Sequence, residues 1–182
     1  MQKIELDGRI YYYNGKYFCD ENFFVLEGAI LGAVSREYYK SVQVNTLSND
    51  DFMEHVVNLK KCGLVYEARK MIEKGFVERG KDGSLLFKLL PVYTSCCREM
   101  NQPQRAIACA EELLPICGGS SATYTSLAAA YCDVGDYENA KRCAGIAYAK
   151  QGGGQGYTTE VSLVFKRIQK ETGEKSEDFD ED

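Results

Sequence analysis

A recurring spacing between helix-breaking residues and alanines constrains the fold of this 182-residue chain more than any other feature. Three such residues are each followed by alanine five positions later, in the pairs Gly63 and Ala68, Asn101 and Ala106, and Gly135 and Ala140. Glycine and asparagine accept the left-handed backbone conformation that ends a helix, so each pair predicts a turn between two helices. The turns are 38 and 34 residues apart, which predicts an internal repeat of helix–turn–helix units.

The last unit shows the predicted packing most clearly. Before the turn, one apolar face recurs at helical spacing, with Tyr124, Leu127, Ala128 and Tyr131. After the turn, a second stripe is formed by Tyr137, Ala140, Ala144 and Ala147. Alanines let two antiparallel helices approach closely, whereas larger side chains would overpack the contact at a cost of about 1–3 kcal/mol.

The residues of these two stripes, together with Gly135, closely resemble the signature of a tetratricopeptide repeat, a 34-residue helix–turn–helix unit. The resemblance implies three copies within residues 48–154, at about 49–82, 87–120 and 121–154. The second copy departs from the family at Pro91, which predicts a kink or a late start of its first helix. The first copy departs from it at His55 and Gly75, where the family has apolar or small residues.

The flanking segments are predicted to close the two ends of such an array, because a stack of repeats exposes an apolar face at each end. Residues 1–47 combine an aromatic β-hairpin around Asn14-Gly15 with a helix near 28–40. The hairpin strands are expected at about 9–13 and 16–20, with a third short strand near 23–26, resting on the first helices. The predicted fold class is therefore mainly α, an α-solenoid of about three tetratricopeptide-like repeats with a small N-terminal β-hairpin.

At the other end, a capping helix is predicted over residues 155–171, after the glycine-rich run 151–156. Its apolar face contains Val161, Val164, Phe165 and Ile168. Residues 172–182 form an acidic tail that is expected to be disordered. Six acids and one lysine lie between residues 174 and 182 and account for the net charge of −5, so the rest of the chain is balanced.

Composition excludes several classes of function. The neutral body lacks the basic footprint of a nucleic-acid-binding protein. No stretch reaches the roughly 18 apolar residues of a membrane span, and the N-terminus is polar where a secretory signal would be apolar. The eight cysteines show no metal-binding spacing and are expected to be reduced and structural. These features predict a cytoplasmic protein with no cofactor and no metal.

Candidate catalytic residues are few. The single histidine, His55, lies on the apolar face of its predicted helix, which favours a hydrogen-bonded packing role over acid–base catalysis. Cys96 and Cys97 point about 100° apart on a helix, which predicts one core thiol and one partly exposed thiol. The glycine run at 152–156 lacks the ending of a phosphate loop. The chain is therefore not expected to be an enzyme.

The resemblance implies instead a protein–protein interaction scaffold or adaptor that binds a protein or peptide partner on its concave face. The residues that would line this groove are Asp50, Met53, Val57, Lys60, Lys88, Ser95, Arg98, Glu99, Ala122, Thr125, Ala129 and Asp133. They lack the lysine and asparagine set with which the family clamps a terminal carboxylate. Self-association as a homodimer is another use for this surface.

Two alternatives stay open. Seven of the fourteen residues from Tyr11 to Phe24 are aromatic, more than a cap requires. A small ligand-binding protein or enzyme could therefore hold a pocket between this region and the first repeat, with tyrosine hydroxyls and His55 inside. In the other alternative, the chain is an accessory or inhibitor protein that acts through its acidic tail.

Overall fold

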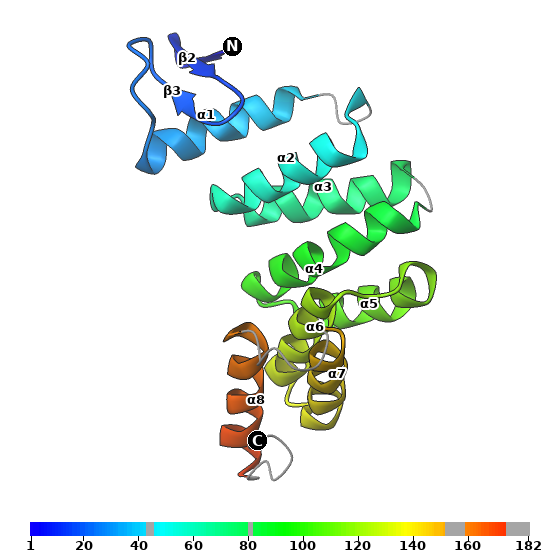
Figure 1. Cartoon of the computed structure of the whole chain (residues 1–182). Helices are drawn as coiled ribbons and strands as arrows, with labels where there is room; N and C mark the ends of the chain where they lie inside the picture. Colours follow the sequence, from blue (N-terminus) through cyan, green and yellow to red (C-terminus); the bar gives the residue numbers. More distant parts are fainter. Residues whose placement is uncertain (43–45, 80–81, 152–158, 174–182) are drawn as a thin grey trace. The chain divides into compact units, whose positions relative to one another are not determined.

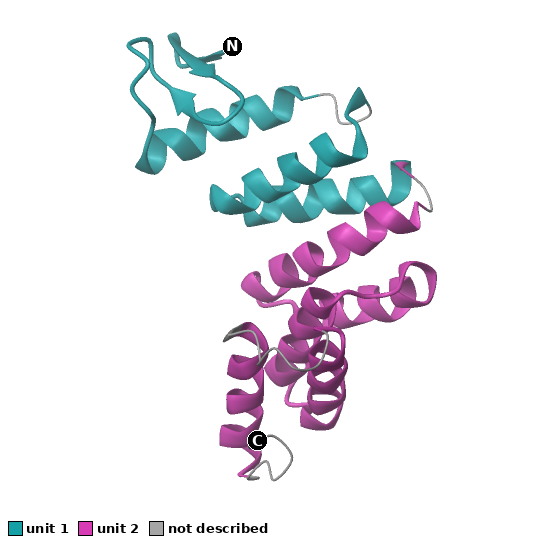
Figure 2. Cartoon of the chain, in the orientation of Figure 1, with its two compact units in different colours: residues 1–78 teal, residues 79–182 magenta. Residues whose placement is uncertain are grey.

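The computed structural model describes residues 1–42, 46–79, 82–151 and 159–173, and helices account for 71% of them. The prediction of a mainly α chain is therefore confirmed (Figure 1). The chain forms two compact units, residues 1–78 and 79–182, coloured separately in Figure 2. The boundary falls within the last residues of the first predicted repeat, at about 49–82. The acidic tail from residue 174 and most of the glycine-rich run lie outside the described residues.

A three-stranded antiparallel sheet begins the first unit, in the order β1 (Gln2–Leu6), β2 (Arg9–Tyr13) and β3 (Phe18–Cys19). The sheet packs on α1 (Gly28–Ser41), as expected for a hairpin that rests on the first helix. The predicted strands at 9–13 and 16–20 correspond to β2 and β3, but β1 was missed. Near 23–26 only a single bridge, between Cys19 and Val25, is formed.

The tight hairpin turn lies at Asp7-Gly8, where both residues have positive φ, 50° and 75°. The hairpin predicted around Asn14-Gly15 is formed by β2 and β3, but its turn is not the two-residue turn that Asn-Gly favours, because only Gly15 has a positive φ there. The Asn14 side chain instead accepts hydrogen bonds from the backbone N–H groups of Lys16 and Tyr17, at 2.9 and 2.7 Å. This side chain stabilises a longer connection, so the turn does not need two left-handed residues.

Three helix pairs follow in the described residues. The first unit contains α2 (Asn49–Lys61) and α3 (Val65–Glu78), and the second contains α4 (Gly83–Glu99), α5 (Pro103–Cys117), α6 (Ser121–Val134) and α7 (Tyr137–Ala149). Within each pair the two helices pack against each other. The alanines five residues after each turn, at 68, 106 and 140, are fully buried in these contacts.

All three predicted turns are confirmed, and they share one geometry. Gly63, Asn101 and Gly135 have φ of 75°, 56° and 79°. At the last turn, the N–H of Gly135 donates to the carbonyl of Cys132 and that of Asp136 donates to the carbonyl of Tyr131. The same pair of hydrogen bonds closes the other two turns, and this pair defines a Schellman motif. The same local structure therefore recurs at the turn of each of the three helix pairs.

The structure contradicts two expectations for α4: a late start, which was one of the two effects predicted for Pro91, and a partly exposed thiol at Cys96 or Cys97. The helix starts at Gly83, eight residues before Pro91, so no late start occurs. The Asp82 carboxylate fixes this start by accepting hydrogen bonds from the N–H groups of Ser84 and Leu85. Cys96 and Cys97 are both fully buried, because α5 and α6 both pack against α4.

The last helix, α8 (Thr159–Thr172), packs on α6 and α7. Val161, Val164 and Ile168 are buried in this contact and Phe165 is half-buried, which confirms the predicted apolar face. The predicted start of this helix at residue 155 lies outside the described residues. All eight cysteines are free thiols.

Candidate functional site: a polar pocket on helices α4, α6 and α8

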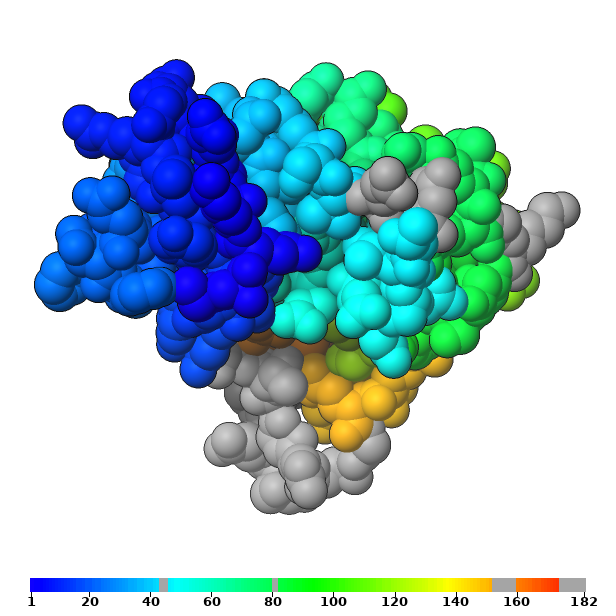
Figure 3. Space-filling model, turned by 90° about the horizontal axis from the view of Figure 1, so that it is seen from above, coloured from blue at the N-terminus to red at the C-terminus, as the bar shows by residue number. Residues whose placement is uncertain are grey.

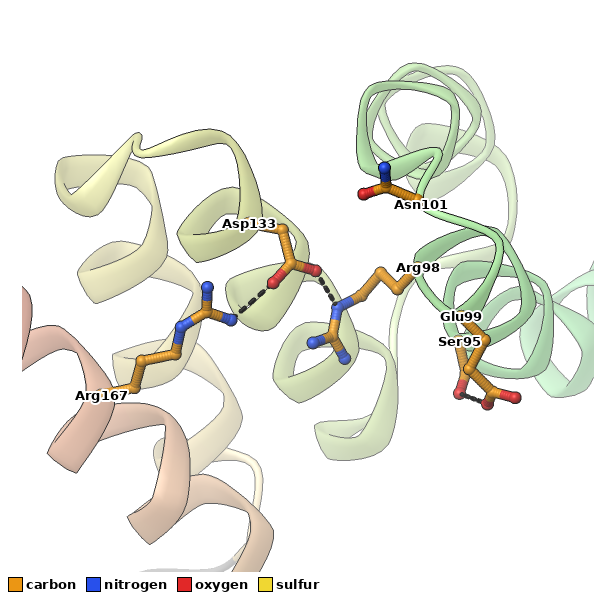
Figure 4. Close-up of a pocket in the computed structure, with 6 residues that line it drawn as sticks. All are labelled: Ser95, Arg98, Glu99, Asn101, Asp133 and Arg167. Carbon is orange, nitrogen blue, oxygen red and sulfur yellow. Dashed lines mark hydrogen bonds and ion pairs between the residues drawn. The ribbon is translucent and has the colours of Figure 1, made fainter.

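A polar pocket of about 400 Å³ opens on the second unit, and four of its six lining residues are predicted groove residues. We call it the polar pocket and define it by Ser95, Arg98, Glu99, Asn101, Asp133 and Arg167 (Figure 4). Helix α4 ends just before the left-handed Asn101, and α6 ends just before the left-handed Gly135. The two turns therefore place the last-turn side chains of α4 and α6 beside the pocket, and α8 contributes Arg167.

Asp133 lies at the centre of this site, between two arginines. Its Oδ2 accepts a hydrogen bond from Arg98 Nε at 2.7 Å, and its Oδ1 accepts one from Arg167 Nη1 at 2.5 Å. Partial burial raises the pKa of this carboxyl, but the hydrogen bonds from the two arginines outweigh burial and hold the pKa below its ordinary value. The carboxylate therefore stays ionised and bridges both guanidinium groups.

The position of Asp133 is unfavourable for the helix itself. A carboxylate in the last turn faces the negative end of the helix dipole, at a cost of about 0.3–1 kcal/mol. The two guanidinium groups offset this cost and join α4, α6 and α8 through one side chain. Asp133 therefore positions the two arginines and does not stabilise α6 itself.

The pocket retains hydrogen-bond donors that the protein does not use. Within the described residues Arg98 donates only through Nε, so the N–H groups of its two terminal nitrogens have no protein partner. Ser95 donates to Glu99 Oε1 at 3.2 Å on the other side of the pocket. This arrangement can bind a polar group that accepts hydrogen bonds from guanidinium.

Comparison of the chain with protein-family models, with curated proteins and with solved structures found no match.

The structure brings Ser95, Arg98, Glu99 and Asp133 together, whereas the other predicted groove residues do not line the polar pocket. Lys88 is exposed nearer the N-terminal end of α4, and Ala129 is buried in the hydrophobic core. The Thr125 hydroxyl donates to the carbonyl of Ser121 within α6. In the first unit Asp50 is exposed on α2, and three further residues of this helix are half-buried: Met53, Val57 and Lys60.

Arg167 and Asn101 line the pocket and were not predicted as site residues. Asn101 was recognised only as a turn residue. Arg167 precedes the core residue Ile168 on α8, so its position on the helix surface could be predicted. Its contact with α6 could not, because it depends on how α8 packs.

Replacing Asp133 with alanine is expected to lower the free energy of unfolding by about 1 kcal/mol, because the two arginines lose their shared acceptor. The side chains are 24–40% exposed, so solvent screens part of the interaction. Urea denaturation followed by circular dichroism measures the effect. Glu112→Gln, at an exposed acid on α5, is the control and should change stability by less than about 0.5 kcal/mol. An equal effect of both substitutions would contradict the assigned network.

A second pocket, of about 190 Å³, lies in the first unit between the sheet, α1 and α2. We call it the aromatic pocket. It is lined by Tyr13, Lys16, Tyr17, Phe18, Val25, Leu26, Leu31, Tyr39, Asn58, Lys61 and Cys62. The structure therefore contains a pocket beside the aromatic region, where the alternative of a ligand-binding protein or enzyme expects one. His55 is not among its lining residues.

His55 is instead packed among aromatic rings, and only 8% of its surface is exposed. Its ring centroid lies 4.2 Å from that of Tyr39, in an edge-on arrangement. The packing role is confirmed, but at Nε2 the expected hydrogen bond is not formed with any of the described residues. Burial lowers the pKa of His55 to about 4, so the imidazole is neutral at pH 7.

None of the helices in the described residues is long and apolar enough to cross a membrane. In the same part of the chain, no group of three or more His, Cys, Asp or Glu side chains could hold a metal ion.

Proposed function

We propose that the protein is an interaction scaffold or adaptor that holds a protein or peptide partner at the polar pocket. The observation that carries this proposal is the convergence of Arg98 and Arg167 on Asp133 in an open pocket, with guanidinium donors left over. The ion pairs fix both arginines before the partner binds. Such preorganisation reduces the conformational entropy lost on binding.

The three helix pairs with identical turns support a short array of tetratricopeptide-like repeats as the framework of this scaffold. Helix α8 would then act as its cap, because it covers the apolar faces of α6 and α7. Eight free thiols support a reducing compartment, so we place the protein in the cytoplasm.

Selection from a displayed peptide library tests the proposal. The full-length chain should enrich peptides that offer carboxylate or carbonyl acceptors, and Arg98→Gln should weaken their binding by about 10-fold to 100-fold. A hydrogen bond to a charged group contributes about 1.5–3 kcal/mol, which corresponds to this range. Fluorescence anisotropy with a labelled selected peptide measures the dissociation constants.

Arg142→Gln is the matched control. This arginine lies on α7 of the same unit, pairs with the Asn139 side chain and does not line the polar pocket. It should leave the affinity unchanged. If no peptide is enriched, or if the two arginine variants bind equally well, the polar pocket is not the binding site.

A further inference from the structure

The loop between β3 and α1 exposes three consecutive apolar side chains. Phe23, Phe24 and Val25 are 61%, 71% and 54% exposed. The segment around residues 20–27, in mid-blue, lies at the surface in Figure 3. Adjacent exposed large apolar residues are unfavourable in water unless a partner covers them. We call residues 20–25 the aromatic loop.

The aromatic loop is held in one conformation by its own hydrogen bonds. Asp20 Oδ1 accepts from the N–H groups of Asn22 and Phe24, each at 2.9 Å, and the N–H of Asp20 donates to the carbonyl of Phe24 at 3.0 Å. These bonds hold Phe23 at a φ of 64°. Positive φ is unfavourable for a bulky residue and persists only where the surroundings impose it. The loop is therefore built to present its side chains in a defined direction.

The aromatic pocket lies next to this loop, because Val25 belongs to both. Aromatic walls are provided by Tyr13, Tyr17, Phe18 and Tyr39. Its volume of about 190 Å³ is close to the roughly 150 Å³ of an engineered cavity that binds benzene. One phenyl ring is thus a suitable occupant, whereas pockets for drug-sized ligands begin at about 300 Å³.

Charges on the loop and the pocket are complementary. Glu21 and Glu27 flank the exposed apolar residues, and Lys16 and Lys61 line the pocket. Among the described residues none of these four side chains has an ion-pair partner. The acids also disfavour docking of the loop onto an anionic membrane surface.

A surface that carries both a protruding element and the matching recess is self-complementary, which is what a two-fold symmetric interface requires. We propose that two copies of the protein form a dimer in which the aromatic loop of each copy inserts Phe24 into the aromatic pocket of the other. Glu21 and Glu27 then face Lys16 and Lys61 across the interface. Phe23 stays on its own chain, where it lies against Tyr12 with ring centroids 5.7 Å apart.

Sedimentation velocity of the full-length chain, from about 1 µM to about 500 µM, tests the dimer. The wild-type protein should show a monomer–dimer equilibrium, and Phe24→Ser should weaken it at least tenfold. Val77→Ser is the matched control, because Val77 is 83% exposed on α3 of the same unit and lies outside the loop and the pocket. It should leave the equilibrium unchanged.

Charge reversal tests the pairing without assuming which acid meets which lysine. The variant Lys16→Glu/Lys61→Glu and the variant Glu21→Lys/Glu27→Lys should each dissociate at least tenfold more readily, and the protein with all four reversals should dimerise again. A chain that stays monomeric at every concentration overturns the proposal, as does a dimer that Phe24→Ser leaves intact. Phe24→Ser should not alter peptide binding at the polar pocket, so the two proposals fail separately.

Discussion

Alanine in place of Gly75 is expected to lower the free energy of unfolding by about 1–3 kcal/mol, because it overpacks the contact between α3 and α2. A Cβ atom at this position would lie 2.6 Å from Cζ and 2.9 Å from Cε1 of Phe52. The Phe52 ring is fully buried and cannot move into solvent. Urea denaturation of the full-length protein measures the loss.

Gly32→Ala provides a control with the opposite sign. Gly32 lies inside α1 of the same unit, without positive φ, and a Cβ atom there would have no neighbour within 4 Å. Alanine should therefore stabilise the protein by about 0.5–1 kcal/mol through its higher helix propensity. If Gly75→Ala were also stabilising, the close packing of α3 on Phe52 would be wrong.

The linked protonation of His55 is expected to lower the free energy of unfolding by up to about 3 kcal/mol as the pH is lowered from about 6.5 to about 4. Burial lowers the pKa of His55 in the folded protein to about 4, whereas the unfolded chain has the ordinary value of 6.5. The unfolded state therefore binds the proton first, and protonation draws the equilibrium toward unfolding. The stability that depends on a neutral His55 is therefore fully present above pH 6.5, the pKa in the unfolded chain, and is lost once the pH falls below about 4.

His55→Gln and His55→Leu isolate this contribution, since the chain has no other histidine. Carboxylates also titrate at the lower end of the range, so the quantity to measure is the difference between wild type and variant at each pH. Between pH 7 and pH 4, the free energy of unfolding of the wild type relative to that of the variant should fall by about 3 kcal/mol. A difference that is constant with pH would show that His55 is not held neutral in the folded state.

Local features of the sequence predicted local structure well. The left-handed residues at 63, 101 and 135 ended helices as expected, because positive φ depends on the residue and its nearest neighbours. Helix α1 was expected at 28–40 and extends over Gly28–Ser41. The same reasoning missed β1 and its turn at Asp7-Gly8, and it predicted a tight turn at Asn14-Gly15, where a longer connection joins β2 to β3.

Features that depend on packing were predicted less well. One of the adjacent Cys96 and Cys97 was expected to be partly exposed when α4 was considered alone, but contacts with both α5 and α6 bury the two thiols. The family resemblance named Arg98 and Asp133 as groove residues on separate repeats, but it did not predict the ion pair that joins them in the structure. Arg167 completes the network from a helix 34 residues further on, a contact that no local pattern contains.

Chemical-shift mapping of the full-length ¹⁵N-labelled protein tests the central claim most directly. On addition of a selected peptide, the largest amide shifts are expected at Ser95, Arg98, Asp133 and Arg167, and they should be absent in Arg98→Gln at the same peptide concentration. Shifts confined to the sheet, α1 and α2, or unchanged by Arg98→Gln, would contradict binding at the polar pocket.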